Sequence, residues 1–367
     1  MKIIKFHEPY KAKNAIKYIQ KVVEDNQYTD DYFKKAASEL LTHKFGYENF
    51  LLTHSATAAL EMTGILLRER KVKKINLPSY TFSSTANAFL RSGIDINFCD
   101  INFSDCTINL NSYTQSGSEY TCLVHYGNSS ANIEECMEVL NYNFVEDAAQ
   151  SFNAKFNNKL LGTFGDFGSI SFHPTKNVHA GFGGMFISKN NEDLEMAKFI
   201  YERGTDRSKV ISGLKNKYEW VIEGSSFEIT ELSAALLLAQ LEEYENIYKI
   251  RKEVYNFYEI GLKNLVTSNK IFTQIINTAL EPNYHAFYII LNEKRTEFLD
   301  FMKNNGVQCY IGYVPLHNSI YGSKLNLNKK LVVTENIADK IVRLPLHTEL
   351  DTNDTEKIVN LINNYFS

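Results

Sequence analysis

The sequence predicts an α/β fold with a large, mostly parallel sheet domain and a smaller C-terminal α/β domain. Two observations carry this prediction. Short apolar runs alternate with stretches of helical spacing between Phe50 and Ile187, a pattern typical of parallel strands whose connecting helices cover both faces of the sheet. The pattern changes near residue 250, after which shorter strand and helix signals follow. We therefore expect a large domain at residues 1–250, including an N-terminal helical segment, and a small domain at residues 251–367.

Each element follows from the spacing of apolar residues. The strands expected in the large domain are Phe50–Leu52, Ile75–Leu77, Ile94–Phe98, Cys122–Val124, Phe144–Val145, Ser169–Phe172 and Met185–Ile187. The helical stretches expected are Pro9–Lys44, Thr57–Arg70, Ser83–Ser92, Ile133–Leu140, Asp193–Glu202 and the long region Ile229–Leu265. In the small domain we expect strands at Ala286–Leu291, Val307–Ile311 and Val342–Leu344, and helices at Arg295–Asn304 and Thr355–Phe366.

Composition and charge argue against several classes of protein. The 367 residues are 44% hydrophobic and 22% charged, as in ordered globular domains. A formal net charge of -4 argues against nucleic-acid binding, because phosphate recognition needs a basic surplus or patch. The five cysteines are scattered without a C-x-x-C pair, so neither a metal site nor a disulfide framework is expected. No secretory signal or membrane-length apolar stretch is evident, and we expect a cytoplasmic protein without a membrane contact.

Three local patterns suggest chemistry. The first is the acid pair Glu146-Asp147, which ends a buried strand and precedes Ala148-Ala149-Gln150. Carboxylates are seldom buried at such a position unless they are paired. The pair is therefore either a structural cap for the following segment or a carboxylate that faces a buried cation.

The second pattern is a single lysine, Lys176, in a turn just beyond the strand at Ser169–Phe172. Most lysines are solvated surface residues. This one lies near the glycine-rich run Gly181–Gly184, and glycines let the backbone approach a ligand closely. A lysine held in such a place can lose its proton more easily and attack a carbonyl.

The third pattern is the sequence Thr53–Leu60, in which a strand end leads through small polar residues into a helix. A simple Ser/Thr cap would explain it. The free N–H groups at the start of that helix would also suit an anion. Pyridoxal 5'-phosphate could use all three patterns, since it needs an amine for its aldehyde, a carboxylate for its ring nitrogen and a helix start for its phosphate.

These residues resemble the sugar-nucleotide aminotransferases of the DegT/DnrJ/EryC1/StrS family, over nearly the whole chain from about Lys5 to Phe366. The segments that carry the resemblance are Pro78–Ala88, Val145–Gln150 and Ser171–Asn177. Further segments are similar to a subgroup, the dTDP-4-amino-4,6-dideoxygalactose transaminases and related dTDP-keto-sugar aminotransferases: Glu202–Ser208, Lys217–Trp220 and Gly224–Phe227. The resemblance implies an aspartate-aminotransferase-like fold (pyridoxal phosphate fold type I) and a homodimer with shared active sites.

The resemblance also implies roles for single residues. Lys176 matches the Schiff-base lysine and Asp147 the partner of the pyridinium nitrogen. Gln150 matches an amide near the phenolic oxygen of the cofactor, and Phe82 an aromatic ring that stacks on the pyridine.

The phosphate-binding positions are matched by Ala56, Thr57 and Ser171, and Ser226 matches a residue that reaches the cofactor phosphate of the partner subunit. The family often has Asn at the position of Ser226 and Arg at that of Glu228, and Glu at that of Phe182. In the small domain, His317 matches a position near the substrate, and we expect Tyr313 to contact the substrate as well. Without the resemblance, a structural role is the better interpretation of His317.

The activity that the resemblance implies is transfer of an amino group from L-glutamate to a nucleotide-linked keto-sugar, expected to be a dTDP-linked 4-keto-6-deoxyhexose used for surface polysaccharide. Two alternatives stay open, a 3-keto-sugar aminotransferase of the same family and a non-catalytic pyridoxal-phosphate-binding regulator of the same fold. A sugar dehydratase of this fold commonly has histidine at the position of Lys176, so that lysine argues against it.

Overall fold

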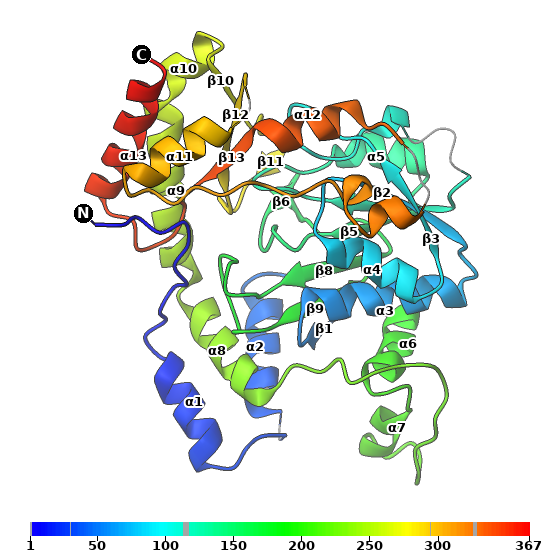
Figure 1. Ribbon diagram of the computed structural model, residues 1–367. Helices are drawn as coiled ribbons and strands as arrows, with labels where there is room; N and C mark the ends of the chain where they lie inside the picture. Colours follow the sequence, from blue (N-terminus) through cyan, green and yellow to red (C-terminus); the bar gives the residue numbers. More distant parts are fainter. Residues whose placement is uncertain (1, 30, 113–116, 294, 326–328) are drawn as a thin grey trace.

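The structure is a computed structural model that describes residues 2–29, 31–112, 117–293, 295–325 and 329–367 (Figure 1). In these residues the largest sheet has seven strands in the order β1-β9-β8-β5-β4-β2-β3. Their bounds are Phe50–Thr53 (β1), Gly184–Ser188 (β9), Phe167–Ser171 (β8), Phe144–Asp147 (β5), Tyr120–Val124 (β4), Lys74–Pro78 (β2) and Asp95–Cys99 (β3). The strands from β8 to β3 are parallel, and β9 runs antiparallel to both of its neighbours. The prediction of a mostly parallel sheet is confirmed.

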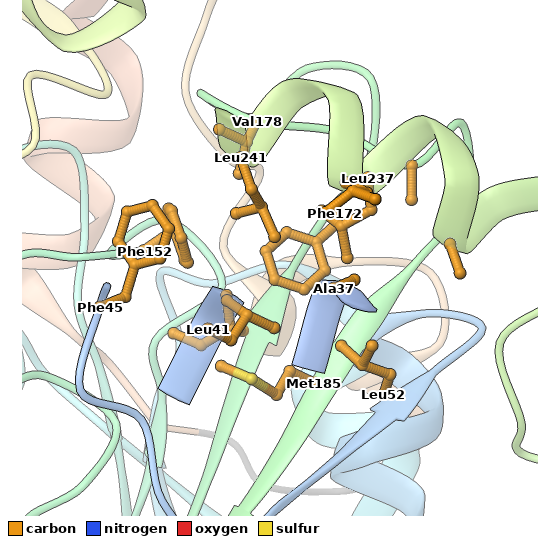
Figure 2. Packing of buried hydrophobic residues seen from close by; sticks show 14 of the residues in the cluster. Ala37, Leu41, Phe45, Leu52, Phe152, Phe172, Val178, Met185, Leu237 and Leu241 are labelled. Atoms are coloured by element: carbon orange, nitrogen blue, oxygen red, sulfur yellow. The ribbon is translucent and has the colours of Figure 1, made fainter. Parts of the chain in front are cut away.

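Helices cover both faces of this sheet because its strands carry apolar side chains on both sides. On β9, Met185 and Ile187 belong to one core and Phe186 to another, as the alternation of side chains along a strand requires. The first core packs under helices α1 (Ala15–Glu24), α2 (Tyr32–His43) and α8 (Glu231–Glu242). Figure 2 shows Leu41 of α2 near Met185, and Leu237 of α8 beside Phe172, in this core.

The second core lies under helices α3 (Ala56–Glu69), α4 (Ser83–Arg91) and α6 (Asn191–Tyr201) on the other face. Helix α5 (Ile133–Leu140) packs in a further cluster with Leu123 and Phe144. All of these helices occur where the spacing of the sequence predicts them.

The C-terminal part contains an antiparallel sheet in the order β10-β12-β13, with strands Ile271–Thr273, Phe287–Leu291 and Ile341–Leu344. Helices α9 (Tyr244–Gly261), α11 (Thr296–Asn304) and α13 (Thr352–Tyr365) pack on it and lie beside both chain termini in Figure 1. Helix α9 runs unbroken through residues 250 and 251, and Ile4 at the N-terminus bridges Val307. The domain division at that point stays a prediction.

Three expected elements differ from the structure. The stretch Pro9–Lys44 contains two separate helices, since α1 ends at Glu24 and α2 begins at Tyr32. The region Ile229–Leu265 forms three consecutive helices, because short breaks separate α8, α9 and α10 (Lys263–Thr267). The segment expected as a strand at Val307–Ile311 makes only isolated bridges, from Val307 to Ile4 and from Tyr310 to Arg343. That strand prediction is wrong, because each neighbour pairs with this segment at a single residue and no ladder forms.

The remaining elements are short. They are α7 (Arg207–Ile211), α12 (Val332–Lys340), the 3-10 helices Leu110–Ser112, Leu316–Asn318 and Gly322–Leu325, and the small sheet β11-β6-β7 of Leu280–Glu281, Lys155–Phe156 and Lys159–Leu160. Among the helices of the described residues, none has the length and apolar character that crossing a membrane requires.

Candidate active site

A cavity of about 430 Å³ lies between the large sheet and the small sheet. Five elements line it. They are the end of β5 with Asp147, the end of β8 with Ser171, the start of α3 with Thr57, the loop after β8 with Lys176, and strand β13 of the small sheet with Arg343. In open α/β sheets ligands bind beyond the carboxyl ends of parallel strands, and this cavity occupies that place.

Lys176 reaches the cavity from the turn that follows β8, where its backbone N–H donates to the carbonyl of His173 at 2.8 Å. The side chain is partly exposed to the cavity. Burial, and then the nearby charge of Arg343, lower the pKa of Lys176 to about 8, while Asp147 acts in the opposite direction. More of this amine is therefore neutral near pH 7 than for an ordinary lysine.

Asp147 is the last residue of β5 and is 5% exposed. Its Oδ2 accepts a hydrogen bond from the hydroxyl of Thr85 at 2.6 Å, and its Oδ1 accepts one from the N–H of Ala149 at 3.2 Å. Its carboxylate thus has a fixed orientation and lines the same cavity as Lys176.

Glu146, the other member of the acid pair, points away from Asp147 because side chains alternate along the strand. Its carboxylate accepts hydrogen bonds from Nε2 of His125 at 3.0 Å and from the backbone N–H groups of Gly162, Phe164 and Gly165 at 2.8, 2.6 and 2.8 Å. The two open interpretations of the acid pair therefore apply to different residues. Glu146 is a buried structural partner, and Asp147 faces the cavity.

The start of α3 forms an anion-binding end of the cavity. Ser55 caps the helix by accepting a hydrogen bond from the N–H of Ala58 at 3.1 Å. Ala56 and Thr57 are the first two helical residues and line the cavity, and N–H groups at these positions have no acceptor inside the helix. Gly184 lets β9 lie against this turn, because a Cβ there would be 2.3 Å from the nitrogen of Ala56.

Two further predicted residues lie on the cavity wall. Gln150 accepts a hydrogen bond from the N–H of Gly127 at 2.8 Å and donates one to the hydroxyl of Tyr313 at 2.9 Å, which fixes the direction of its amide. Phe82 is 58% exposed at the start of α4, with its ring 6.3 Å from that of Tyr313. An exposed ring on a cavity wall suits stacking on a flat ligand.

Two predicted residues do not line the cavity. Ser226 accepts a hydrogen bond from Arg203 at 2.9 Å, and the same guanidinium pairs with Glu228 at 2.9 Å. His317 is 7% exposed and is bonded to Ser79 at 2.6 Å and Glu335 at 3.3 Å. The substrate contact predicted for His317 gains no support from this position, where the ring has two structural partners.

Sequence reasoning missed the basic residues on the small-domain side of the cavity. Arg251 lies on the buried side of α9 and donates to the carbonyls of Tyr284 at 3.0 Å and His285 at 2.6 Å. Arg343 stands in β13, where its neighbours in sequence are apolar. A charged residue within an otherwise apolar strand was the available signal, because such a residue needs a buried partner or a ligand.

A profile of the DegT/DnrJ/EryC1/StrS aminotransferase family matches residues 9–363. The chain belongs to this family. Among curated relatives, it is 22% identical to the GDP-perosamine synthase of Escherichia coli O157:H7, with 100% of each chain covered. It is 23% identical to the UDP-4-amino-4,6-dideoxy-N-acetyl-beta-L-altrosamine transaminase of Campylobacter jejuni, over 89% of this chain and 86% of that one. The crystal structure of the sugar aminotransferase CalS13 from Micromonospora echinospora superimposes with a TM-score of 0.90 at 17% identity, covering 99% of this chain and 100% of that one.

Family membership confirms two predictions, pyridoxal phosphate fold type I and pyridoxal phosphate as the cofactor. The cavity of this aminotransferase fits that cofactor by its chemistry. The amine of Lys176, with its lowered pKa, suits the aldehyde, and the hydrogen-bonded carboxylate of Asp147 suits the ring nitrogen. The N–H groups of Ala56 and Thr57, which have no acceptor inside the helix, suit the phosphate. The named relatives act on GDP- and UDP-linked sugars, so the family is shown and the dTDP subgroup is not.

Proposed function

We propose that this chain transfers an amino group from L-glutamate to a nucleotide-linked 4-keto-6-deoxyhexose, with Lys176 and Asp147 as its catalytic residues. The observation that carries the proposal is that the amine of Lys176 and the carboxylate of Asp147 line one cavity, with the start of α3 at its anion-binding end. Pyridoxal phosphate, when bound, supplies an aldehyde and an electron-withdrawing ring. Side chains of the protein would hold the cofactor, orient it and move the protons.

Lys176 would hold the cofactor covalently and, once displaced by the amino donor, move a proton to and from the donor carbon. Both tasks need the neutral amine, and the lowered pKa of Lys176, to about 8, makes it available near neutral pH. The carboxylate of Asp147 would keep the ring nitrogen protonated, and its hydrogen bonds to Thr85 and Ala149 hold it in place for that purpose.

The remaining predicted residues would position the cofactor. Ala56, Thr57 and Ser171 surround the expected phosphate site, and the hydroxyl of Thr57 donates to that of Ser84 at 2.8 Å. Gln150 would direct its amide toward the phenolic oxygen, because Gly127 and Tyr313 fix its orientation. Phe82 would stack on the pyridine ring. Tyr313, which accepts a hydrogen bond from Gln150, would line the substrate side of the site.

Two arguments favour amination at C4 of the sugar. The name of the Campylobacter relative states a 4-amino-4,6-dideoxy product, and the segments Glu202–Ser208 and Lys217–Trp220 resemble those of dTDP-4-keto-sugar aminotransferases. We propose dTDP as the nucleotide on that second ground, and surface polysaccharide as the destination of the product.

We also propose that the protein acts as a homodimer in the cytoplasm. Several large apolar side chains between α7 and α8 are exposed, including Leu214 at 77%, Tyr218 at 59% and Trp220 at 81%. Large apolar side chains exposed within one short segment are typical of an interaction surface. Ser226 lies shortly after them in the sequence, and the family resemblance implies that it reaches the cofactor phosphate of the partner subunit. All five cysteines are free thiols, as a reducing compartment favours.

The test is to incubate the purified protein with L-glutamate and, in parallel, dTDP-, GDP- and UDP-linked 4-keto-6-deoxyhexoses and a 3-keto isomer. NMR of the product assigns both the nucleotide and the aminated carbon. Amination at C4 of the dTDP sugar is expected. Turnover restricted to the 3-keto sugar would overturn the proposal in favour of a 3-keto-sugar aminotransferase. No turnover with any sugar, while pyridoxal phosphate stays bound, would overturn it in favour of a non-catalytic regulator.

A further inference from the structure

The turn that carries Lys176, residues 173–176, is called the lysine turn below, and most of its hydrogen bonds are local. The backbone N–H of Lys176 donates to the carbonyl of His173 at 2.8 Å. Nδ1 of His173 lies 2.9 Å from the hydroxyl of Thr175, and the N–H of His173 donates to the hydroxyl of Ser171 at 3.3 Å. These bonds give the turn its shape, but none of them reaches a segment that is distant in sequence.

Among the residues that the structure describes, His7 supplies the one hydrogen bond that joins the lysine turn to a distant segment. Its Nε2 lies 2.6 Å from the carbonyl oxygen of Pro174. A carbonyl oxygen only accepts, so Nε2 carries the proton. Proline has no N–H of its own, and its carbonyl is therefore the group that can be held. Just after the turn, Asn177 donates to the carbonyl of Asn283 at 2.6 Å, so the reacting amine stands between two long-range contacts.

The ring of His7 makes this bond without adding a charge to the cavity that it lines. Burial, opposed by the bond to Pro174, lowers the pKa of His7 to about 4, and the ring is neutral near pH 7. The cavity is already lined by Lys176, Arg251 and Arg343. A further cation at this place would bury like charges together, which is costly. A neutral donor avoids that cost.

The chain just before this histidine is fastened to the C-terminal part of the protein. The N–H of Ile4 donates to the carbonyl of Gly306 at 2.8 Å, and the carbonyl of Ile4 accepts from the N–H of Gln308 at 3.0 Å. Next in sequence, the carbonyl of Lys5 accepts a hydrogen bond from Nε2 of His347 at 3.0 Å. This short N-terminal segment therefore connects the C-terminal part of the chain to the lysine turn.

We propose that His7 is a positioning residue for Lys176. Its hydrogen bond to Pro174 fixes the lysine turn against the N-terminal segment and so directs the amine into the cavity. This inference depends on the proposed function, because it takes Lys176 to be the reacting amine. A displacement of about 1 Å in a reacting group can cost roughly 100-fold in rate, so a bond that only holds the turn affects the chemistry.

A direct contact between His7 and a ligand is the competing explanation, since His7 lines the cavity. Nε2 is occupied by Pro174, which leaves Nδ1 for such a contact. The two explanations differ in their consequences. Loss of a positioning bond loosens the turn even in the cofactor-free protein and lowers kcat. Loss of a ligand contact raises a KM and leaves the turn unchanged.

The experiment compares His7→Phe, which keeps a ring without a donor, with His7→Gln, whose amide nitrogen can donate from near the position of Nε2. His43→Phe is the matched control, because His43 is exposed at the end of α2. The first readout is hydrogen–deuterium exchange of the cofactor-free proteins, followed by mass spectrometry. Peptides that contain the lysine turn should exchange severalfold faster in His7→Phe, and at close to the wild-type rate in the other two variants. Peptides from helix α13 should not change in any variant.

The second readout uses pyridoxal phosphate and then the holoenzyme. The rate at which the cofactor-free protein takes up pyridoxal phosphate, followed by visible absorbance, should fall in His7→Phe. Its kcat should fall about 10-fold or more, while the KM values for L-glutamate and the nucleotide sugar stay within about twofold of those of the wild type. His7→Gln should recover most of the rate, and His43→Phe should behave as the wild type.

The inference is overturned if the lysine turn of His7→Phe, at an unchanged melting temperature, exchanges like that of the wild type. It is also overturned if a KM rises while exchange and kcat stay unchanged, since His7 would then contact a ligand. Faster exchange throughout the protein would overturn it as well, because His7 would then support stability in general. A wild type that takes up no pyridoxal phosphate would instead refute the proposed function, and hydrogen exchange of the turn would still test His7.

Discussion

The hydroxyl of Thr85 donates a hydrogen bond to Oδ2 of Asp147 at 2.6 Å, from helix α4 to the end of strand β5. The hydroxyls of Thr85 and Thr81 are also 2.9 Å apart, so a short chain of hydroxyl groups leads to the carboxylate. Asp147 therefore takes its orientation from a helix that lies more than fifty residues earlier in the sequence.

Replacing Thr85 by valine should lower kcat about tenfold or more while the KM for the amino donor changes little. The physical reason is the loss of a hydrogen bond to a charged group, worth about 1.5–3 kcal/mol. Steady-state kinetics measure both constants. Thr85→Ser retains the donor and should recover most of the rate; equal defects in the serine and valine variants would show that packing, and not the hydrogen bond, matters.

Replacing Asp147 by asparagine should leave pyridoxal phosphate bound but slow amino transfer by at least about 100-fold, because the negative charge that protonates the ring nitrogen is lost. Single-turnover absorbance measurements with L-glutamate give the rate, and the visible spectrum of the resting enzyme reports cofactor binding. Near-normal turnover in this variant would refute the role that we assign to Asp147.

The lowered pKa of Lys176, from 10.5 to about 8, predicts how the stability of the cofactor-free protein depends on pH. Between these two values the unfolded chain binds more protons at this residue than the folded chain, so the contribution of Lys176 to the free energy of unfolding rises with pH across this window. Below about pH 8 the charged amine lowers the free energy of unfolding by at most about 3 kcal/mol.

Lys176→Met should therefore be more stable than the wild type at pH 7, and this advantage should shrink as the pH approaches 10.5. Urea unfolding of both cofactor-free proteins across pH 6–10 measures the difference. A constant difference in the free energy of unfolding at all pH values would contradict the lowered pKa of this amine.

Glu146 should be essential for folding and not for chemistry. Its buried carboxylate accepts a hydrogen bond from His125 and three from backbone N–H groups. Glu146→Ala would leave these donors buried without an acceptor and should lower the free energy of unfolding by roughly 3–5 kcal/mol. Glu138→Ala, at an exposed position of α5, is the control and should change it little.

The contribution of Glu146 to stability should depend on pH. Burial acts to raise the pKa of Glu146, but the hydrogen bonds from His125 and the backbone outweigh it and hold the pKa below its usual range. Because the folded pKa is depressed, this contribution to stability is present above the ordinary pKa and is lost as the pH falls through the lower folded value. The wild type should therefore lose its advantage over Glu146→Ala in acid, and a gap that widened there would oppose this account.

Gly184→Ala should weaken cofactor binding. A Cβ at this position would lie 2.3 Å from the nitrogen of Ala56 and 2.3 Å from the carbonyl carbon of Ser55, both backbone atoms at the expected phosphate site. Displacing them should cost about 1–3 kcal/mol through overpacking. Equilibrium dialysis of pyridoxal phosphate and thermal melting would detect the change, and wild-type values in both would show that the turn can move freely.

Much of the fold follows from local patterns. The apolar residues of strands β4, β5 and β8 predict these strands, and the residues at or after the ends of the strands in sequence also lie at their carboxyl ends in space. For that reason the sequence alone indicates Asp147 and Lys176 as candidate site residues. The antiparallel direction of β9 could not be predicted, because a fully buried strand has the same apolar pattern in either direction.

The sequence by itself determined the order along the chain of most strands and helices, and the two residue types, amine and carboxylate, at or just after the ends of core strands. Only the tertiary structure decided what faces them. Gln150 meets Tyr313 across 163 positions of the chain, and Arg343 reaches the neighbourhood of Lys176 from a separate sheet. Local spacing encodes which side of a strand or helix is buried, whereas contacts of this range depend on how two packed sheets meet, and that is a property of the whole chain.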